Sequence, residues 1–280
     1  MIDETLEGPV PEKHKYAALI AYEGTNYCGW QRQAVASGIQ PSIQETLEQA
    51  IHRITGETPS VVGSGRTDSG VHAVGQVAHF VLSRKVWEPW VLERALGSHL
   101  PIDIRVQRIA QVPLDFHSQR SAVKKQYSYY FQQGPSALPH VEPYSWWIRK
   151  KLDLDAMNEA LSYLIGEHDF KPFQARGARP GPTVRTILEA EAVVEPLAFP
   201  GGQSSQAHFV RIRLMGTGFL KQMVRGIAGT LLQVGEGRRP PTCTRDILAS
   251  GIRKEVGQTA PGRALWLERV WYQEKFGLPF

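Results

Sequence analysis

The spacing of apolar residues is most regular near the start of the chain. Residues 15–22 form an apolar stretch that predicts a strand. Residues 42–45 read SIQE, in which a serine and a glutamate three positions later cap the start of a helix. The residues that follow place one apolar face at helical spacing, made by Ile43, Leu47, Ala50, Ile51 and Ile54. The pattern therefore predicts a capped helix over residues 42–54.

The rest of the chain mixes strands and helices in the same way. Further strands are predicted at residues 76–82, 104–109, 125–132, 145–150, 186–195, 207–214 and 264–273, and helices at 88–99, 154–165 and 218–234. Neither half shows the regular strand–helix alternation of a doubly wound parallel sheet, so an α+β fold with antiparallel sheets is favoured. Two loops rich in glycine, residues 174–183 and 196–205, are predicted to be excursions rather than domain linkers.

Length and composition set the domain organisation that we expect. A chain of 280 residues with 42% hydrophobic content can bury a substantial core. We expect a flexible leader over residues 1–13, an N-terminal α+β domain over 14–112 and a C-terminal α+β domain over 113–280. The leader is acidic and contains two prolines, which is not typical of a signal peptide. No apolar run approaches membrane-spanning length, and we expect a cytoplasmic protein that does not enter a membrane.

The cysteines and histidines give no sign of a metal site or a disulfide framework. Cys28 and Cys243 are too few for either a disulfide framework or a cysteine-based metal site. The nine histidines form no HExxH pair, and none stands near a cysteine at zinc-finger spacing. We therefore expect no metal.

Charge is unevenly distributed. Residues 1–112 hold 10 basic and 12 acidic residues, whereas residues 113–280 hold 22 and 15, which gives the second part a net charge of +7. Its basic residues cluster at Lys124/Lys125, Arg149/Lys150/Lys151, Arg176/Arg179/Arg185, Arg211/Arg213, Lys221/Arg225, Arg238/Arg239 and Arg253/Lys254. This distribution suits a polyanionic partner, and solvated surface charge is the alternative.

Residues 63–73, GSGRTDSGVHA, carry the densest chemical signal in the chain. The spacing matches neither GxGxxG nor GxxxxGK[ST], so this glycine-rich loop is not a known phosphate loop. What remains is a backbone that can approach a ligand closely and that presents Asp68 beside Arg66. Such a carboxylate could act as a nucleophile. In the structural alternative, Asp68 caps a backbone amide and pairs with Arg66.

Further motifs stand in order around this loop. They are YEGTNYCGWQ at residues 22–31, Gln76-Val77, KQYSY at 125–129, HDF at 168–170, TVRTI at 183–187, GFL at 218–220, MVR at 223–225 and GTL at 229–231. Together with GRTDSGVHA they make residues 14–272 resemble the TruA family of tRNA pseudouridine synthases.

The resemblance implies an isomerase that converts uridine to pseudouridine at positions 38, 39 and 40 of the tRNA anticodon arm, without metal or organic cofactor. The family's catalytic aspartate falls on Asp68. Arg66 would help to displace the target base, and Tyr127 would stack on it. Arg225 would pair with the aspartate. Leu265 would form an apolar wall of the uracil pocket, although Ala264 stands where the family usually has glycine.

The resemblance also implies the overall fold and the partners. The family fold has two similar α+β domains whose antiparallel sheets join across a catalytic cleft, and it forms homodimers that bind tRNA. The alternatives to a tRNA-modifying enzyme are a non-catalytic RNA-binding protein and a pseudouridine synthase that acts on another RNA. Without the resemblance, Tyr127 would be assigned to a buried strand face and Arg225 to the surface of an amphipathic helix.

Overall fold

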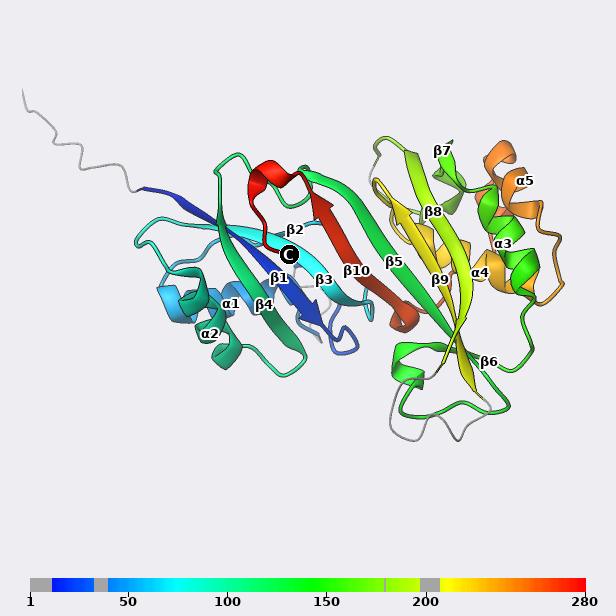
Figure 1. Cartoon of the computed structure of the whole chain (residues 1–280), viewed down its shortest axis with the longest axis horizontal. Helices are drawn as coiled ribbons and strands as arrows, with labels where there is room; N and C mark the ends of the chain where they lie inside the picture. Colours follow the sequence, from blue (N-terminus) through cyan, green and yellow to red (C-terminus); the bar gives the residue numbers. More distant parts are fainter. Residues whose placement is uncertain (1–11, 33–39, 179, 197–206) are drawn as a thin grey trace, which may run out of the picture.

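One large sheet organises the molecule. The computed structural model describes residues 12–32, 40–178, 180–196 and 207–280. Its strands are β1 (His14–Tyr22), β2 (Val62–Gly63), β3 (His72–Leu82), β4 (Ile104–Val112), β5 (Ala122–Gln133), β6 (Trp146–Ile148), β7 (Gly166–Asp169), β8 (Val184–Glu195), β9 (His208–Gly216) and β10 (Leu265–Tyr272). Within the described residues these strands form a 10-stranded sheet whose main path runs β4-β1-β3-β10-β5-β9-β8-β7 (Figure 1).

Five α-helices accompany this sheet within the described part of the chain, and the last of them packs on the third rather than on the strands. They are α1 (Ile43–Thr55), α2 (Pro89–His99), α3 (Leu154–Ser162), α4 (Met223–Gly235) and α5 (Cys243–Ser250). In the view of Figure 1, α1 and α4 lie behind the strands. Because most neighbouring strands are antiparallel and the helices are not in regular alternation with them, the fold is α+β, as predicted.

The predicted cap of the first helix is confirmed. The Ser42 side chain accepts a hydrogen bond from the backbone amide of Glu45 at 3.1 Å. The helix ends at Gly56, whose φ of 73° is a left-handed conformation that glycine adopts without strain. Between these ends, Ile43, Leu47 and Ile51 are buried.

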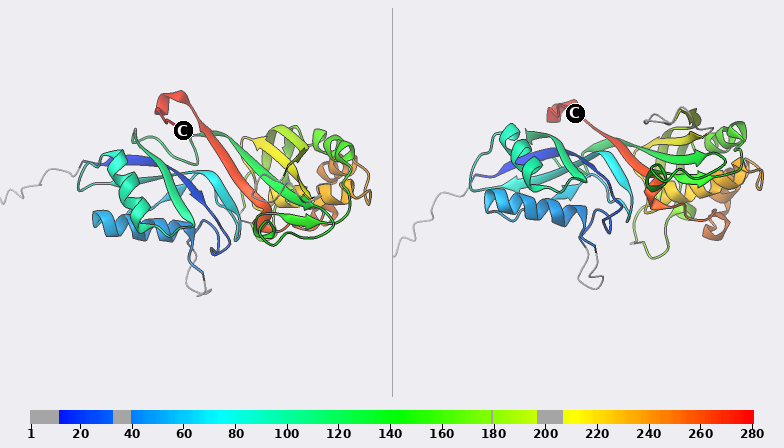
Figure 2. Two further views of the ribbon diagram at one scale, coloured as in Figure 1. Left: turned by 60° about the horizontal axis from the view of Figure 1, so that its bottom comes forward. Right: turned by 90° about the horizontal axis from the view of Figure 1, so that it is seen from below.

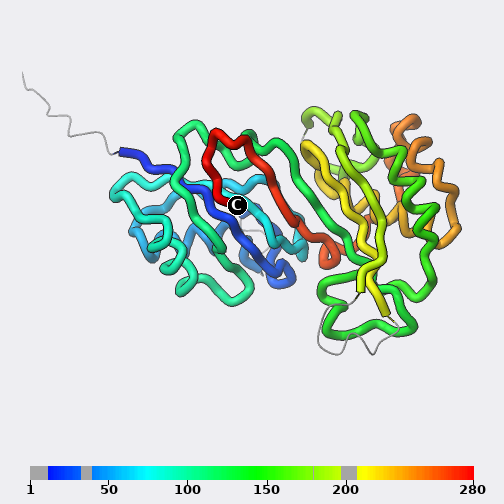
Figure 3. Tube along the Cα trace, in the orientation of Figure 1, coloured from blue at the N-terminus to red at the C-terminus, as the bar shows by residue number. Residues whose placement is uncertain are grey.

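The last strand of the chain lies in the middle of the sheet. β10 pairs antiparallel with β5 and, over Trp266 and Leu267, parallel with β3. Figure 3 shows the red C-terminal segment between the cyan and green parts of the trace. The contact with β3 is close, because a Cβ added at Gly75 would lie 2.0 Å from the carbonyl oxygen of Glu268. The end of the chain therefore joins the two halves of the sheet.

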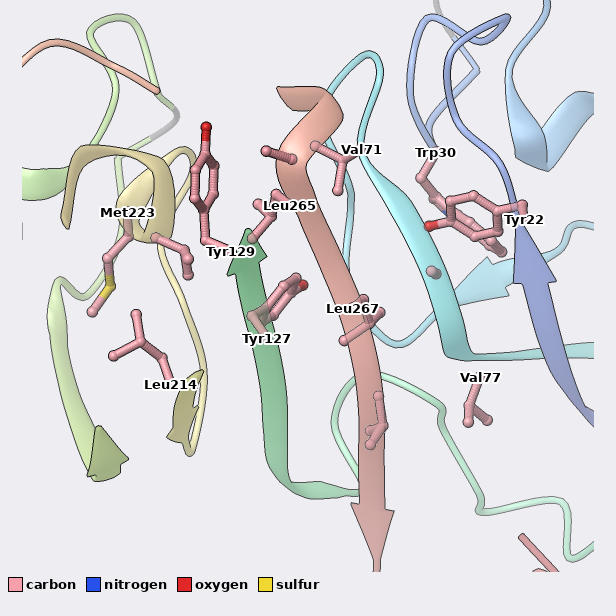
Figure 4. Packing of buried hydrophobic residues seen from close by; sticks show 14 of the residues in the cluster. Tyr22, Trp30, Val71, Val77, Tyr127, Tyr129, Leu214, Met223, Leu265 and Leu267 are labelled. Atoms are coloured by element: carbon pink, nitrogen blue, oxygen red, sulfur yellow. The ribbon is translucent and has the colours of Figure 1, made fainter. Parts of the chain in front are cut away.

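Buried aromatic and aliphatic side chains fill the centre of this junction. In the β5–β10 register, Leu265 lies opposite Tyr129 and Leu267 lies opposite Tyr127. All four are buried, and Figure 4 shows them together. One continuous core cluster includes these residues and the buried faces of helices from both halves.

Helix α4 begins later than the apolar spacing predicted, at Met223 instead of residue 218. Gln222 has a φ of 60°, which an α-helix cannot continue through. The carbonyl oxygen of Lys221 accepts a hydrogen bond from the backbone amide of Ala175 at 3.0 Å instead of an intrahelical one. The start of α4 is thus fixed by a segment distant in sequence, and Arg225 falls in its first turn.

Other boundaries also differ from the prediction. Helix α3 ends at Ser162 rather than residue 165, and β7 and α5 were not predicted. β7 reads GEHD, which has no apolar alternation and is a strand because it pairs with β8. The buried face of α5 is made by Cys243, Thr244 and Ile247, so it lacks the aliphatic stripe on which the prediction depends.

Some expectations fall on residues outside the described ranges. These are most of the predicted leader, residues 1–11, most of the predicted loop 196–205, and Arg179 of the basic clusters. In the described residues, no helix is both long enough and apolar enough to cross a membrane.

Candidate active site

Asp68 lies in the loop between β2 and β3. Trp30 donates a backbone hydrogen bond to the Thr67 carbonyl oxygen at 3.0 Å, and the hydroxyls of Tyr22 and Thr67 are 2.8 Å apart. The amide of Val71 donates to the Asp68 carbonyl oxygen at 3.2 Å, which closes the turn. The residues on both sides of Asp68 are therefore held by neighbouring segments.

Two glycines of the 22–31 motif let that segment approach the loop closely. A Cβ at Gly24 would lie 2.1 Å from the Val71 carbonyl oxygen. Gly29 has a φ of 109°, and a Cβ there would lie 2.6 Å from the Thr67 carbonyl oxygen. The two motifs recognised in the sequence are thus packed against each other around Asp68.

Buried polar side chains support the other side of the loop. The Ser64 hydroxyl donates to Gln76 Oε1 at 2.6 Å, and Gln76 Nε2 donates to the Gly65 carbonyl oxygen at 3.0 Å. Lys125 Nζ donates to the Ser64 carbonyl oxygen at 2.5 Å. The sequence interpretation counted Lys125 among the basic clusters suited to a polyanion, which is wrong, because this side chain is only 8% exposed.

Two other basic residues of those clusters are neutralised. Arg211 pairs with Glu195 at 2.8 Å, and Arg213 pairs with Glu191 at 2.9 Å across β8 and β9. These two arginines therefore add little net charge to the surface.

The Asp68 side chain is paired with an arginine that is distant in sequence. Arg225 Nη1 donates to Asp68 Oδ2 at 2.9 Å, and the two side chains are 15% and 22% exposed, respectively. Arg225 Nε donates to the Ala260 carbonyl oxygen at 2.7 Å, and the Ala260 amide donates back to the Arg225 carbonyl oxygen at 3.2 Å. The segment before β10 thus holds both the guanidinium and the backbone carbonyl of Arg225.

This pairing contradicts the structural alternative for Asp68. Within the described residues, Arg66 is exposed and has no hydrogen-bond or ion-pair partner. There, too, the Asp68 carboxylate accepts no backbone amide, and its Oδ1 has no hydrogen-bond partner. Asp68 is therefore neither a cap nor a partner of Arg66, and one of its oxygens is available to another group.

Tyr127 and Leu265 lie on the two central strands beside the loop. Tyr127 is 8% exposed and packs edge to face against Phe219, with ring centroids 5.1 Å apart. A Cβ added at Gly65 would lie 3.6 Å from the Tyr127 hydroxyl, so this side chain ends against the loop that carries Asp68. Burial, with Tyr22 and Asp68 nearby, raises the pKa of the Tyr127 phenol, which keeps it neutral. Leu265 is 6% exposed.

His72 is a further residue near the site whose role the sequence did not reveal. Its Nδ1 accepts the amide of Gly24 at 3.0 Å, and its Nε2 lies 2.8 Å from the Arg263 carbonyl oxygen. The ring stacks on Trp266 with centroids 4.3 Å apart. Burial lowers the pKa of His72, so the neutral ring connects the 22–31 segment to the start of β10. The only sign of His72 in the sequence was its position in the GVHA motif at residues 70–73.

The arrangement can present one carboxylate oxygen to a substrate while an arginine stabilises the other. A carboxylate of this kind can act as a nucleophile or stabilise developing positive charge. In the described residues, no group of three or more His, Cys, Asp or Glu side chains is placed to hold a metal ion.

Lys125 leads to a prediction about stability and pH. Burial, followed by the charge of Arg185, lowers the pKa of Lys125 from 10.5 to about 8. Between these values the unfolded chain binds a proton that the folded protein does not, so the free energy of unfolding should rise with pH. Lys125→Met should remove this rise.

The measurement is urea unfolding from pH 8 to about 9.5, with the slopes compared between variants, because the onset of tyrosine ionisation contributes equally to all of them. The neighbouring Lys124→Met is the matched control and should keep the wild-type slope. Parallel pH profiles for wild type and Lys125→Met would show that the buried amine is not titrating in this window.

Comparison with known proteins places the site in a family. A model of the tRNA pseudouridine synthase family matches residues 18–119 and 160–273, which include Asp68, Arg66, Arg225 and Leu265 but not Tyr127. The chain is similar to proteins named tRNA pseudouridine synthase A. It is 42% identical to that of Maridesulfovibrio salexigens over 91% of this chain and 89% of the relative. It is 40% identical to that of Syntrophotalea carbinolica over 91% and 94%, and 39% identical to that of Chlamydia trachomatis serovar A over 92% of each. The chain belongs to the tRNA pseudouridine synthase family.

Proposed function

We propose that the protein isomerises uridine to pseudouridine at positions 38, 39 and 40 in the anticodon arm of tRNA, with Asp68 as its catalytic residue. The observation that carries this proposal is the Asp68–Arg225 pair, which leaves Asp68 Oδ1 without a partner in the described residues. Membership of the tRNA pseudouridine synthase family supports the reaction and the substrate class.

The proposed reaction rearranges bonds without a net change in composition. The bond between uracil N1 and ribose C1′ breaks, the base turns, and a bond forms between C5 and C1′. The proton on C5 leaves and N1 becomes protonated. Asp68 can assist by adding to C1′ or to C6, or by stabilising charge on the sugar, and all three routes use the same free oxygen.

The surrounding residues suit the handling of a displaced base. Arg66 is exposed and has no partner in the described residues, so it can enter the RNA and help to displace the uridine. Tyr127 can stack on the base, and Leu265 can contact it as an apolar wall. Arg225 would position Asp68.

The proposal includes the domain organisation and the partners. Residues 14–112 and 113–280 would form two α+β domains with a catalytic cleft between them. A homodimer would extend the basic surface that binds tRNA, because each chain has a second part of net charge +7. The protein would act in the cytoplasm, where tRNA is found, and would need neither a metal nor an organic cofactor.

The test is to incubate the protein with an unmodified tRNA transcript and to map pseudouridine along it. We expect pseudouridine at whichever of positions 38, 39 and 40 is a uridine, and none after these uridines are replaced by cytidine. Binding without product would support a non-catalytic RNA-binding protein. Product in ribosomal or messenger RNA fragments but not in tRNA would instead support a synthase with another target.

Tyr127 provides a prediction about the base-binding residues. Tyr127→Phe keeps an aromatic ring, whereas Tyr127→Ala removes it, and stacking on a base contributes ~1 to 3 kcal/mol. We therefore expect the alanine variant to be at least ~5-fold slower than the phenylalanine variant in single-turnover assays. Equal losses would assign the role to the hydroxyl, and equal retention in folded variants would leave Tyr127 as a core residue only.

A further inference from the structure

A basic pocket lies next to the helix that carries Arg225. Its volume is about 420 Å³, and its lining includes Arg176, Lys221, Arg253 and Lys254. No acidic residue lines it. We call the cavity lined by these four side chains the basic pocket. Lys221 comes shortly before α4, and Arg176 is on the loop that follows the short helix η2 (Lys171–Phe173).

The charge of the basic pocket is not neutralised. None of its four cations is within ion-pair distance of a carboxylate in the described residues, in contrast to Arg211 and Arg213. Arg253 Nη2 donates to the Thr259 hydroxyl at 3.3 Å, but its buried Nε has no partner. Burial and the nearby charge of Arg176 lower the pKa of Arg253. An anion bound here would relieve this repulsion.

The walls of the pocket are fixed by contacts between distant segments. The Ala175 amide donates to the Lys221 carbonyl oxygen at 3.0 Å, and the Gly257 amide donates to the Thr230 hydroxyl at 3.0 Å. A Cβ added at Gly229 would lie 1.8 Å from the Gln258 carbonyl oxygen, so α4 lies directly against the far wall. The pocket is therefore built before any ligand arrives.

The same walls are joined to the catalytic pair. Thr259 lines the pocket, and the next residue, Ala260, accepts the hydrogen bond from Arg225 Nε. Lys221 and Gln222 also line the pocket and lead into the first turn of α4, which contains Arg225. The right-hand view of Figure 2 shows the yellow-green loop that carries Arg176 projecting from the side of the molecule on which α1 and α4 lie. A ligand in the pocket would thus bind close to the residue that holds Asp68.

We propose that the basic pocket binds a backbone phosphate of the RNA that delivers the target uridine. This inference rests on the proposed function, which supplies the RNA. Two guanidinium groups can each offer paired donors to phosphate oxygens, and the two lysines add charge without fixing a geometry. A phosphodiester suits the pocket because it is anionic under all physiological conditions and belongs to a strand that can run on to Asp68.

The test compares tRNA binding by the Arg176→Gln/Arg253→Gln double variant with that of wild type. We expect the dissociation constant to rise about 10-fold and the slope of log affinity against log salt to become shallower by about 1, as for the loss of roughly one phosphate contact. Lys221→Gln/Lys254→Gln, two exposed positions, provides a second variant and should act in the same direction. Arg245→Gln removes a cation that pairs with Asp246 outside the pocket, and it should bind like wild type.

Three measurements separate the possible outcomes. Wild-type affinity and salt slope in both double variants would overturn the inference. A second outcome would also overturn the inference. In it, inorganic phosphate at matched ionic strength raises the melting temperature of wild type but not of Arg176→Gln/Arg253→Gln, while the two proteins bind tRNA equally. The pocket would then bind free phosphate rather than RNA. Pseudouridine formation is measured with wild type alone, so its absence would contradict the proposed function independently of the pocket.

Discussion

The ion pair between Asp68 and Arg225 is the interaction on which the rest of the site depends. Its partners are far apart in the chain, and they meet only because β10 lies between β3 and β5 in the centre of the sheet. Arg225 is fixed in turn by Ala260, shortly before β10 begins. A partly buried carboxylate needs a cationic partner such as the Arg225 guanidinium, because an unpaired charge is costly to desolvate. The fold therefore places Asp68 and stabilises its charge through one junction.

The loop that carries Asp68 is held mainly by neutral contacts. Backbone hydrogen bonds, the Tyr22 and Thr67 hydroxyls, and the close approach of Gly24 and Gly29 fix its course without using the carboxylate. Burial raises the pKa of Tyr22 to about 12, so this support stays neutral near pH 7. The Asp68 carboxylate is thus not needed to hold the loop, and Arg66 in the same loop is exposed.

The features that the sequence predicted are those set by local patterns or by ordered motifs. The cap at Ser42, the α+β class and the family all follow from such signals. Features set by tertiary contact were not predictable. From the sequence, Lys125 looked like one of several surface cations. Its burial depends on the packing of β5 against residues 64–66, which the local pattern does not show. The late start of α4 depends on Ala175, and the four-residue β7 exists only through its pairing with β8.

The most direct measurement is single-turnover formation of pseudouridine by Asp68→Asn with enzyme in excess over tRNA. This change keeps the side chain's size while the net charge goes from +5 to +6. We expect a folded protein that binds tRNA at least as well as wild type and forms pseudouridine at least ~1,000-fold more slowly, equivalent to ~4 kcal/mol of lost transition-state stabilisation. Asp246→Asn, on the exposed surface of α5, is the matched control and should retain wild-type activity. Near-normal product from a folded Asp68→Asn variant would contradict the assignment of Asp68 as the catalytic residue.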